Sequence, residues 1–105
     1  MKKATFHEDA DAEMIEAAKF YEERASGLGF SFLAAVEDAV IQIRDNPKAY
    51  PLLGDDIRRK LVKRFPYGLI FAEEHDRIRI VAVAHLKRRP EYWRYRLSAE
   101  NLAWQ

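Results

Sequence analysis

The sequence predicts an α+β domain in which a helical hairpin packs on a small antiparallel β-sheet. The first half of the chain carries apolar residues at helical spacing, whereas the second half changes to the two-residue period of strands. Residues that favour tight turns separate these segments. The 105 residues are close to the usual size of one domain, so we expect residues 1–105 to fold as a single unit.

The first predicted helix begins in an acidic cluster. Carboxylates at residues 8, 9, 11 and 13 can cap free N–H groups and favour the positive end of a helix dipole. Apolar residues then recur along one stripe at Ala10, Met14, Ala17, Ala18, Tyr21 and Ala25. Ser26-Gly27 ends this helix, because glycine adopts the left-handed C-cap conformation at little cost. The segment Ala4–His7 ahead of it is compatible with a short N-terminal edge strand.

A second helix is expected to start near Leu28–Phe30 and to end at Asn46-Pro47, since proline disfavours helix in the residue before it. Its apolar side holds Phe32, Leu33, Val36, Val40 and Ile43. Because only a few residues link the two helices, they should form an antiparallel hairpin. The stretch Asn46–Asp56 contains two prolines and one glycine and is predicted to be a loop.

Three strands should follow as an antiparallel meander. The first is Ile57–Phe65, and Pro66-Tyr67-Gly68 turns the chain into the second, Leu69–Glu73. The polar group Glu74-His75-Asp76 makes the next turn. The third strand, Ile78–Ala84, is rich in branched residues that favour a sheet.

The first strand of this meander should have one buried and one cationic face. Its buried face is predicted to hold Ile57, Leu61 and Phe65. Its cationic face is predicted to hold Arg58, Lys60 and Arg64. Three residues interrupt the alternation: Arg59, Val62 and Lys63. A row of cations matches phosphates along a nucleic-acid backbone, but it would equally protect an edge strand from aggregation.

Charge is segregated along the chain although the formal net charge is only +1. Residues 1–56 hold 6 Lys and Arg against 12 Asp and Glu, a balance of −6, and residues 57–105 hold 12 against 5, a balance of +7. This asymmetry indicates an anionic partner for the second half. The alternative is that acidic helices and basic strands neutralise each other within the fold, and charge alone leaves both open.

Several function classes are disfavoured by composition. The chain has no cysteine, which excludes disulfides, thiolate catalysis and Cys-based zinc sites and suits a reducing cytosol. The N-terminus lacks the apolar stretch of a signal peptide, and the apolar runs are too short to cross a bilayer. His7 and Glu8 lack metal-ligand spacing with another histidine, and there is no glycine-rich phosphate loop. We therefore expect a cytoplasmic protein with no membrane association, metal or cofactor.

Basic and aromatic side chains interleave in His85–Arg96, directly after the last predicted strand. Segments that follow strands often present functional side chains from a rigid sheet. The cations can hold phosphates while the aromatic rings stack on bases. His85 and Tyr92 are candidates for proton transfer. The alternatives are a histidine bonded to the backbone at a strand end, and aromatic rings that pack the segment onto the sheet.

These features together resemble the RelE/ParE superfamily of bacterial toxins from type II toxin–antitoxin pairs. The element order matches, Asn46-Pro47 closes the second helix, and FPYG at residues 65–68 is followed by VAVAHLKRRPEYWRYR at residues 81–96. The combination of FPYG with H-x-x-R-x-P-x-Y-W carries most of the resemblance, which extends from about Phe6 to Arg96. The FPYG form looks closer to the ParE-like branch.

The ParE-like resemblance implies a growth-inhibiting toxin of a plasmid-stabilisation module that binds DNA gyrase without catalysis. Target-binding residues would then be Arg58, Arg64, Lys87, Arg89, Trp93 and Arg96. The alternative implied by the superfamily is a RelE-like enzyme that cleaves messenger RNA on the ribosome without metal. Its catalytic residues would be Lys60, Lys63, His85, Arg88 and Tyr92. Such ribonucleases typically carry an arginine early in the middle strand, where this chain has Gly68, so the non-enzymatic alternative is favoured.

Either branch of the superfamily implies a cognate antitoxin that lays a partly disordered segment across the toxin. The basic half of the chain offers such a peptide both charge and apolar contact. Leu97, Leu102 and Trp104 are apolar enough to need covering. We expect oligomers only through this antitoxin complex.

Overall fold

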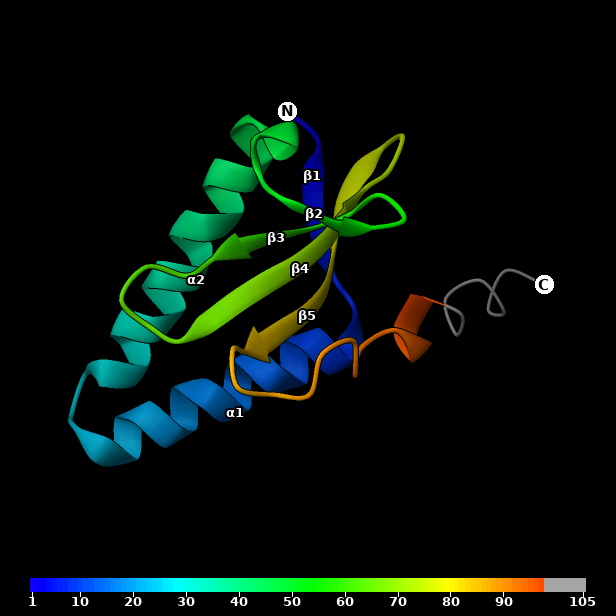
Figure 1. Ribbon diagram of the computed structural model, residues 1–105. Coiled ribbons are helices and arrows are strands. Elements are labelled where there is room, and N and C mark those ends of the chain that lie inside the picture. Colours follow the sequence, from blue (N-terminus) through cyan, green and yellow to red (C-terminus); the bar gives the residue numbers. More distant parts are fainter. Residues whose placement is uncertain (98–105) are drawn as a thin grey trace.

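The computed structural model describes residues 1–97 as one helical hairpin and one sheet (Figure 1). The elements in chain order are β1 (Lys3–Phe6), α1 (Glu8–Arg24), α2 (Leu28–Asp45), the 3-10 helix η1 (Pro47–Ala49), β2 (Leu52–Gly54), β3 (Ile57–Leu61), β4 (Tyr67–Glu73) and β5 (Arg77–His85). The predicted α+β class and the helical hairpin are confirmed. Leu102 and Trp104, which we expected to need covering, lie outside the described residues.

The sheet has five strands in the order β1-β5-β4-β3-β2. The expected N-terminal strand is present, but it pairs parallel to β5, with Thr5 opposite Arg79. All other neighbours are antiparallel, so the sheet is mixed rather than antiparallel throughout. The parallel pair arises because the helical hairpin carries the chain away from β1 before the meander is formed.

The prediction of a loop over Asn46–Asp56 was wrong in part, because η1 and β2 lie within it. β2 pairs with β3 through a tight hairpin in which Asp55 and Asp56 both have positive φ, 48° and 63°. Such angles at both central residues are typical of a type I′ turn, for which aspartate is well suited. All three residues of β2 are exposed, so no apolar alternation marked the strand in the sequence.

The β3–β4 hairpin also differs from its prediction. β3 ends at Leu61, which is exposed rather than buried, and β4 begins at Tyr67, which we expected in a turn. The N–H of Val62 donates to the carbonyl of Tyr67 at 2.8 Å, and Arg64 has a φ of 75° between them. β3 therefore ends four residues earlier than the predicted Phe65, and Val62 instead of Leu61 enters the core.

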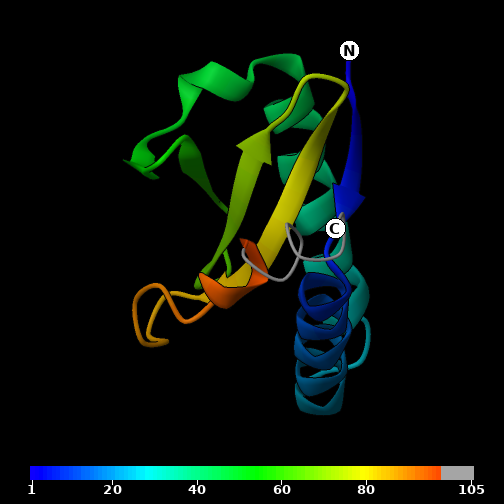
Figure 2. The same cartoon turned by 90° about the vertical axis from the view of Figure 1, so that its right-hand side faces the viewer.

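The two faces of the sheet are covered differently. α1 and α2 lie on one side, as the two perpendicular views show, and they bury Leu69, Phe71 and Ile80 (Figures 1 and 2). On the other side a smaller apolar cluster of strand residues packs against Trp93 from the segment after β5. That segment therefore completes the second face of the sheet.

A β-bulge in β5 sets which residues face the helices. Ile70 lies opposite Ala82 whereas Phe71 lies opposite Ile80, so Val81 is an extra residue. The bulge shifts the alternation, and Val83 joins the helix-side core while Val81 and Ala82 face the other way. β1 ends opposite Ile80, so the backbone of β5 beyond that residue has no strand partner on this edge among the described residues.

Candidate functional site

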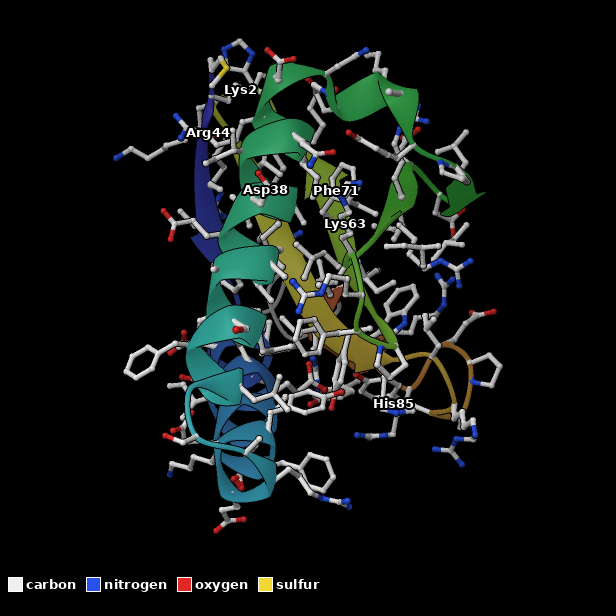
Figure 3. All side chains as sticks on the ribbon, turned by 90° about the vertical axis from the view of Figure 1, so that its left-hand side faces the viewer. Lys2, Asp38, Arg44, Lys63, Phe71 and His85 are labelled. Carbon is white, nitrogen blue, oxygen red and sulfur yellow. The ribbon has the colours of Figure 1, made fainter. Side chains whose placement is uncertain are left out.

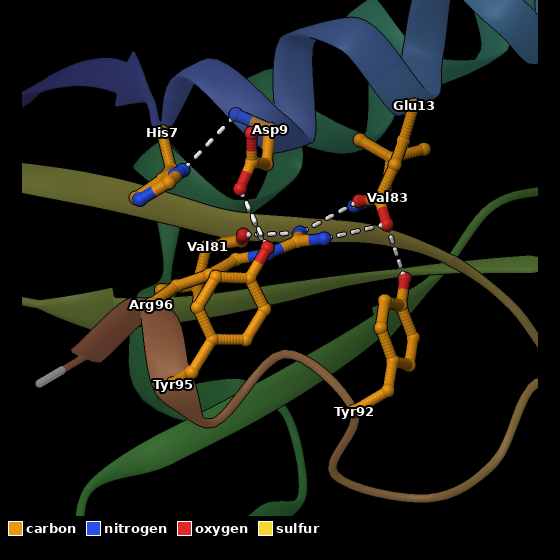
Figure 4. Close-up of polar contacts among 8 residues, drawn as sticks. All are labelled: His7, Asp9, Glu13, Val81, Val83, Tyr92, Tyr95 and Arg96. Atoms are coloured by element: carbon orange, nitrogen blue, oxygen red, sulfur yellow. Dashed lines mark hydrogen bonds and ion pairs between the residues drawn. The ribbon is translucent and has the colours of Figure 1, made fainter. Parts of the chain in front are cut away.

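The segment after β5 is held against α1 by a charged contact (Figure 4). Arg96 donates from Nη1 to Oε1 of Glu13 at 2.8 Å and from Nη2 to Oε2 at 2.9 Å. The hydroxyl of Tyr92 donates to the same Oε2 at 2.6 Å. We call Glu13, Tyr92 and Arg96 the C-terminal clasp. Bidentate arginine–carboxylate contacts are among the stronger hydrogen-bonded pairs, so the clasp fixes the path of the segment.

The clasp also satisfies the backbone of the bulged strand. The N–H of Val83 donates to Glu13 Oε1 at 3.0 Å, and Arg96 Nη1 donates to the carbonyl of Val81 at 3.0 Å (Figure 4). β1 has ended by this point, since its last ladder contact is the N–H of His7 to the carbonyl of Ile80. The side chains of Glu13 and Arg96 thus bond to backbone groups of β5 that lie beyond the end of β1.

The electrostatics of the clasp keep both of its donors protonated. Burial raises the pKa of Tyr92, and the hydrogen bond to Glu13 and the charge of Glu13 raise it further. Burial acts to lower the pKa of Arg96, but its hydrogen bonds to Glu13 and Tyr95 outweigh this and raise the pKa above its ordinary value. Tyr92 therefore serves as a neutral hydrogen-bond donor at physiological pH.

A second contact links the same segment to the start of α1. The hydroxyl of Tyr95 donates to Oδ2 of Asp9 at 2.6 Å and holds the pKa of that carboxyl below its ordinary value, with the charge of Arg96 acting in the same direction. Asp9 in turn donates its backbone N–H to Nδ1 of His7, which caps the helix. The N-terminus of α1 and the end of the described chain are thus joined twice.

Some of the predicted target-binding and catalytic residues of this segment are buried, and others are exposed. Trp93 and Arg96 are each only 4% exposed, and Tyr92 is half-buried, so these three hold the segment in place. The alternative in which the aromatic rings pack onto the sheet fits Tyr92 and Trp93. In contrast Lys87, Arg88 and Arg89 are exposed on the turn that follows β5. The accessible charge of the segment is therefore concentrated in that turn.

A cleft of about 240 Å³ lies between this turn and the outer face of the sheet. On the sheet side it is lined by Leu53, Arg59, Ile70 and Ala84. On the turn side it is lined by His85, Leu86, Arg88, Arg89, Pro90, Glu91, Tyr92 and Trp93. We call this the basic cleft. The guanidinium carbon of Arg88 lies 3.9 Å from the centre of the Tyr92 ring, a cation–π contact that couples the turn to the clasp.

Arg59 is a member of the basic cleft that the sequence pattern did not identify. It was only an interruption in the predicted alternation, yet its side chain crosses the neighbouring strand above Gly68. A Cβ atom at Gly68 would lie 3.0 Å from Cδ and 3.1 Å from Cγ of Arg59. RelE-like ribonucleases carry an arginine at the position where this chain has Gly68. Because glycine has no side chain, Arg59 from β3 has room to lie over this position. Only the register, with Leu61 opposite Gly68, reveals this neighbour.

His85 is engaged with the backbone at the strand end. Its Nδ1 accepts the N–H of Lys87 at 3.0 Å, and its ring meets the Tyr67 ring edge-on at 5.1 Å. His85 and Arg88 also line a second cleft of about 420 Å³ beside α1, together with Glu16. The placement matches the alternative of a histidine satisfied by a backbone partner.

The expected cationic strand face holds for Arg58 and Lys60, which both contact Tyr50, but not for Arg64. Arg58 donates to the carbonyl of Tyr50 at 2.7 Å, and Lys60 Nζ lies 5.2 Å from the centre of the Tyr50 ring. Lys63 and Arg64 line a separate cleft of about 320 Å³ against α2. The turn at Arg64 breaks the strand and causes this divergence. Figure 3 shows Lys63 well away from His85, and the lining of the basic cleft includes neither Lys60 nor Lys63.

Among residues 1–97 no group of three or more His, Cys, Asp or Glu side chains could hold a metal ion. In the same part of the chain no helix combines the length and the apolar composition needed to cross a membrane.

Comparison with known proteins gives a consistent result. Residues 4–90 match a family model described as the ParE toxin of the type II toxin–antitoxin system parDE. A solved chain of the chromosomal ParDE toxin–antitoxin system from P. aeruginosa superposes with a TM-score of 0.59 at 19% sequence identity. The match covers 81% of this chain and 96% of that chain, and at this identity it concerns the fold. No curated protein matches the sequence.

Proposed function

This chain belongs to the ParE family of type II toxins, and from that premise we propose that it inhibits DNA gyrase by binding it through the basic cleft. The family match over residues 4–90 is the observation that carries the proposal. Because gyrase acts on the chromosome, the toxin would work in the cytoplasm. A cognate antitoxin would keep it inactive, as expected of a type II pair.

The geometry of the basic cleft supports a binding role. Arg88, Arg89 and Lys87 are exposed on a short turn, and Arg59 adds a fourth cation from the sheet. Arginine and aromatic residues are the types enriched at binding hot spots, and exposed cations speed encounter with an anionic partner. The clasp fixes the turn before binding, which lowers the entropy lost on association.

Cleavage of messenger RNA has weaker support in the same arrangement. The ribonuclease assignment needs Lys60 and Lys63 near His85 and Arg88, but the two lysines line other parts of the surface. Tyr92 is held protonated by the clasp, so it is poorly suited to accept a proton. Cleavage of messenger RNA is therefore kept as one of the results that the following assays can distinguish.

A gyrase supercoiling assay tests the proposal. The purified toxin should inhibit supercoiling, and the double variant R88A/R89A should need about tenfold more protein for half-inhibition. The matched control is K19A/R24A, which also removes two exposed cations but from α1, and it should inhibit like the wild type.

Two results would overturn the proposal. One is equal inhibition by R88A/R89A and the wild type. The other is a wild-type toxin that leaves gyrase active but cleaves messenger RNA in a translation extract. In the second case H85A and R88A would show whether that part of the ribonuclease assignment is correct.

A further inference from the structure

The basic cleft combines an apolar lining with cations that have no counter-charge nearby. The apolar lining consists of Leu53, Ile70, Ala84, Leu86, Pro90 and Trp93. Among residues 1–97 no carboxylate forms an ion pair with Arg59, Arg88 or Arg89. An occupant that satisfies this cleft must therefore bring both an apolar group and a negative charge.

The size of the basic cleft suits one side chain of a partner. Its volume of about 240 Å³ is smaller than the clefts of about 300–1,000 Å³ that enclose small organic ligands. Ile70, Ala84 and Trp93 are buried, whereas the three arginines are exposed. A carboxylate with an apolar neighbour would meet the cations at the margin while apolar groups cover the floor.

The aromatic rings that line the basic cleft are already engaged within the protein. The guanidinium carbons of Arg88 and Arg96 lie 3.9 Å and 5.3 Å from the centre of the Tyr92 ring. Trp93 is only 4% exposed. Proteins that bind single-stranded nucleic acid without sequence preference stack bases on open aromatic faces. The base stacking that the sequence suggested therefore has no open ring in this cleft.

Carboxylates also border the cations. Arg88 lines both the basic cleft and the cleft beside α1. Glu91 lines the first of these clefts, and the exposed Glu16 lines the second. Affinity for a nucleic acid grows with the number of phosphates that cations neutralise along its backbone. A phosphate backbone that leaves Arg88 through either cleft would meet a carboxylate, and like charges repel.

Glu91 keeps a negative charge in its cleft although it makes an ion pair. Its Oε1 accepts a hydrogen bond from Nε of Arg94 at 2.6 Å. Nη1 of the same guanidinium donates to Oδ2 of Asp55 at 3.2 Å. Because two carboxylates share one guanidinium, the group as a whole retains one negative charge.

The backbone at Glu91 would accept glycine more easily. Its φ is 63°, and it follows Pro90 in a turn where the N–H of Tyr92 donates to the carbonyl of Arg89 at 3.4 Å. Proline followed by a residue with positive φ is typical of a type II turn, which favours glycine at this position. Non-glycine residues held in such conformations cluster at functional sites. The strain thus favours a role for the carboxylate itself.

We propose that the basic cleft receives an acidic side chain flanked by apolar residues of the gyrase protein, and that Glu16 and Glu91 exclude nucleic-acid backbones, including the DNA that gyrase holds. This inference rests on the proposed function and adds the chemistry of the partner. A protein segment can present one carboxylate between uncharged residues, so it meets the cations without approaching Glu16 or Glu91. A nucleic acid carries a charge at every nucleotide and cannot do so.

A titration with nucleic acid tests the excluding role. The probes are a short labelled single-stranded RNA and a short duplex DNA, measured by fluorescence anisotropy at about 0.1 M salt. E16Q/E91Q should bind both at least about tenfold more tightly than the wild type, because two repelling charges are gone. E91G should also bind more tightly, and glycine suits the backbone there. The control E23Q/E37Q removes two exposed carboxylates elsewhere on α1 and α2 and should bind like the wild type.

The gain of affinity in this titration separates charge exclusion from a structural role, since damage to the fold would weaken binding. The unfolding midpoint of each variant shows that it folds. Unchanged affinity in E16Q/E91Q and E91G would overturn the excluding role. Tight RNA binding by the wild type would overturn the inference as well and would favour the ribonuclease.

Chemical cross-linking identifies the group that enters the cleft. R89K places a primary amine at its margin, and the probe is purified gyrase without DNA. A water-soluble carbodiimide joins an amine to a carboxylate in contact with it, and the reagent takes up the water that is lost. Mass spectrometry should find position 89 joined to an aspartate or glutamate of gyrase that has apolar neighbours. Lys19 on α1 is the internal control and should stay unlinked.

The inference and the proposed function fail separately. If the wild type inhibits gyrase but binds it only when DNA is present, and R89K gives no cross-link to the DNA-free protein, this inference is wrong and the proposed function stands. If the wild type neither binds nor inhibits gyrase, the proposed function is wrong, and with it the source of the carboxylate. The nucleic-acid titration would still decide whether Glu16 and Glu91 exclude phosphates.

Discussion

At the scale of single residues, Glu13 has the most consequences for this fold. One carboxylate accepts from the guanidinium of Arg96, the hydroxyl of Tyr92 and the backbone of Val83. From the sequence alone it was one of several acidic residues at the start of a helix. Its role depends on a residue 83 positions later, which no local pattern reveals.

Replacing Glu13 by glutamine should therefore be costly. The amide removes the nearer counter-charge of the buried Arg96 guanidinium and leaves only Asp9, 3.9 Å from its Nε. Breaking a buried pair destabilises a protein by about 3 kcal/mol. Urea unfolding measures the loss. Glu16, which is exposed one turn later, offers the matched control E16Q, expected to change stability by less than about 0.5 kcal/mol. Equal stabilities for E13Q and E16Q would show that the clasp contributes little.

Tyr92 makes stability sensitive to alkaline pH. Its pKa is raised in the folded state, so below about pH 10 it is protonated in both states and its contribution is complete. As pH rises above that value, the unfolded chain ionises first and the folded state loses stability. The unfolding free energy should begin to fall near pH 10, the ordinary tyrosine pKa, and should continue to fall as the pH rises further toward the raised pKa of the folded state.

The variant Y92F isolates this effect. It should lose about 1–2 kcal/mol at neutral pH, because the charge-assisted hydrogen bond is gone. It should also show a shallower alkaline decline, and the remainder arises from Tyr67 and Tyr21, whose pKa values burial also raises. An unchanged decline in Y92F would contradict the assignment.

At the scale of elements, the contact between β3 and β4 depends on a glycine, because a side chain at that position would meet Arg59. Gly68 lies in β4 where the stem of Arg59 crosses from β3. The arrangement places a cation in the basic cleft without an arginine in the middle strand. It also makes the position of that cation sensitive to a single added methyl group.

The variant G68A tests this link. The new Cβ would meet Arg59 at about the limit of contact, so the flexible stem should move and weaken gyrase inhibition several-fold, with stability changed by less than about 1 kcal/mol. In an R59A background the same substitution should cause no further loss of gyrase inhibition, which is the result expected of two coupled sites. Additive effects on inhibition would mean that Gly68 acts independently of Arg59.

The sequence predicted elements well where one period persisted. Both helices and the strands β4 and β5 follow long apolar patterns, and their predicted ends are close to the observed ones. β2 was missed because it buries nothing, and β3 was extended too far because Arg64 turns the backbone. Lys87, Arg88 and Arg89, which the sequence proposed for binding or catalysis, lie on the exposed turn after β5, and their roles stay predictions. Arg59 and Glu13 were missed, since strand register and the packing of the last segment decide their neighbours.

At the scale of the whole molecule, the segregated charge has two roles. Part of it is neutralised internally, where Asp9 and Glu13 face Arg96, and Asp55 faces Arg94. The remainder is exposed on the turn after β5, where it can act on a partner. Internal neutralisation therefore applies to the paired residues, whereas an anionic partner for the exposed cations stays a prediction.

The exposed part predicts a salt dependence. Association of the toxin with gyrase should slow by about tenfold between 0.05 M and 0.3 M salt, because exposed charges are screened over about 10 Å or less. Stopped-flow measurements give the rate. The variant R88A/R89A should show a weaker dependence than K19A/R24A. Similar slopes for the two variants would indicate that the whole surface, rather than the turn, steers the encounter.

The length of chain between the two ends of the clasp has a consequence for synthesis. Glu13 is made early and Arg96 is almost the last described residue to be added. Until Arg96 has been made, Glu13 on α1 has no guanidinium to bind, and the turn that carries Arg88 and Arg89 lacks the contacts that hold it against the sheet. The turn therefore takes its final position later in synthesis than the sheet on which it lies.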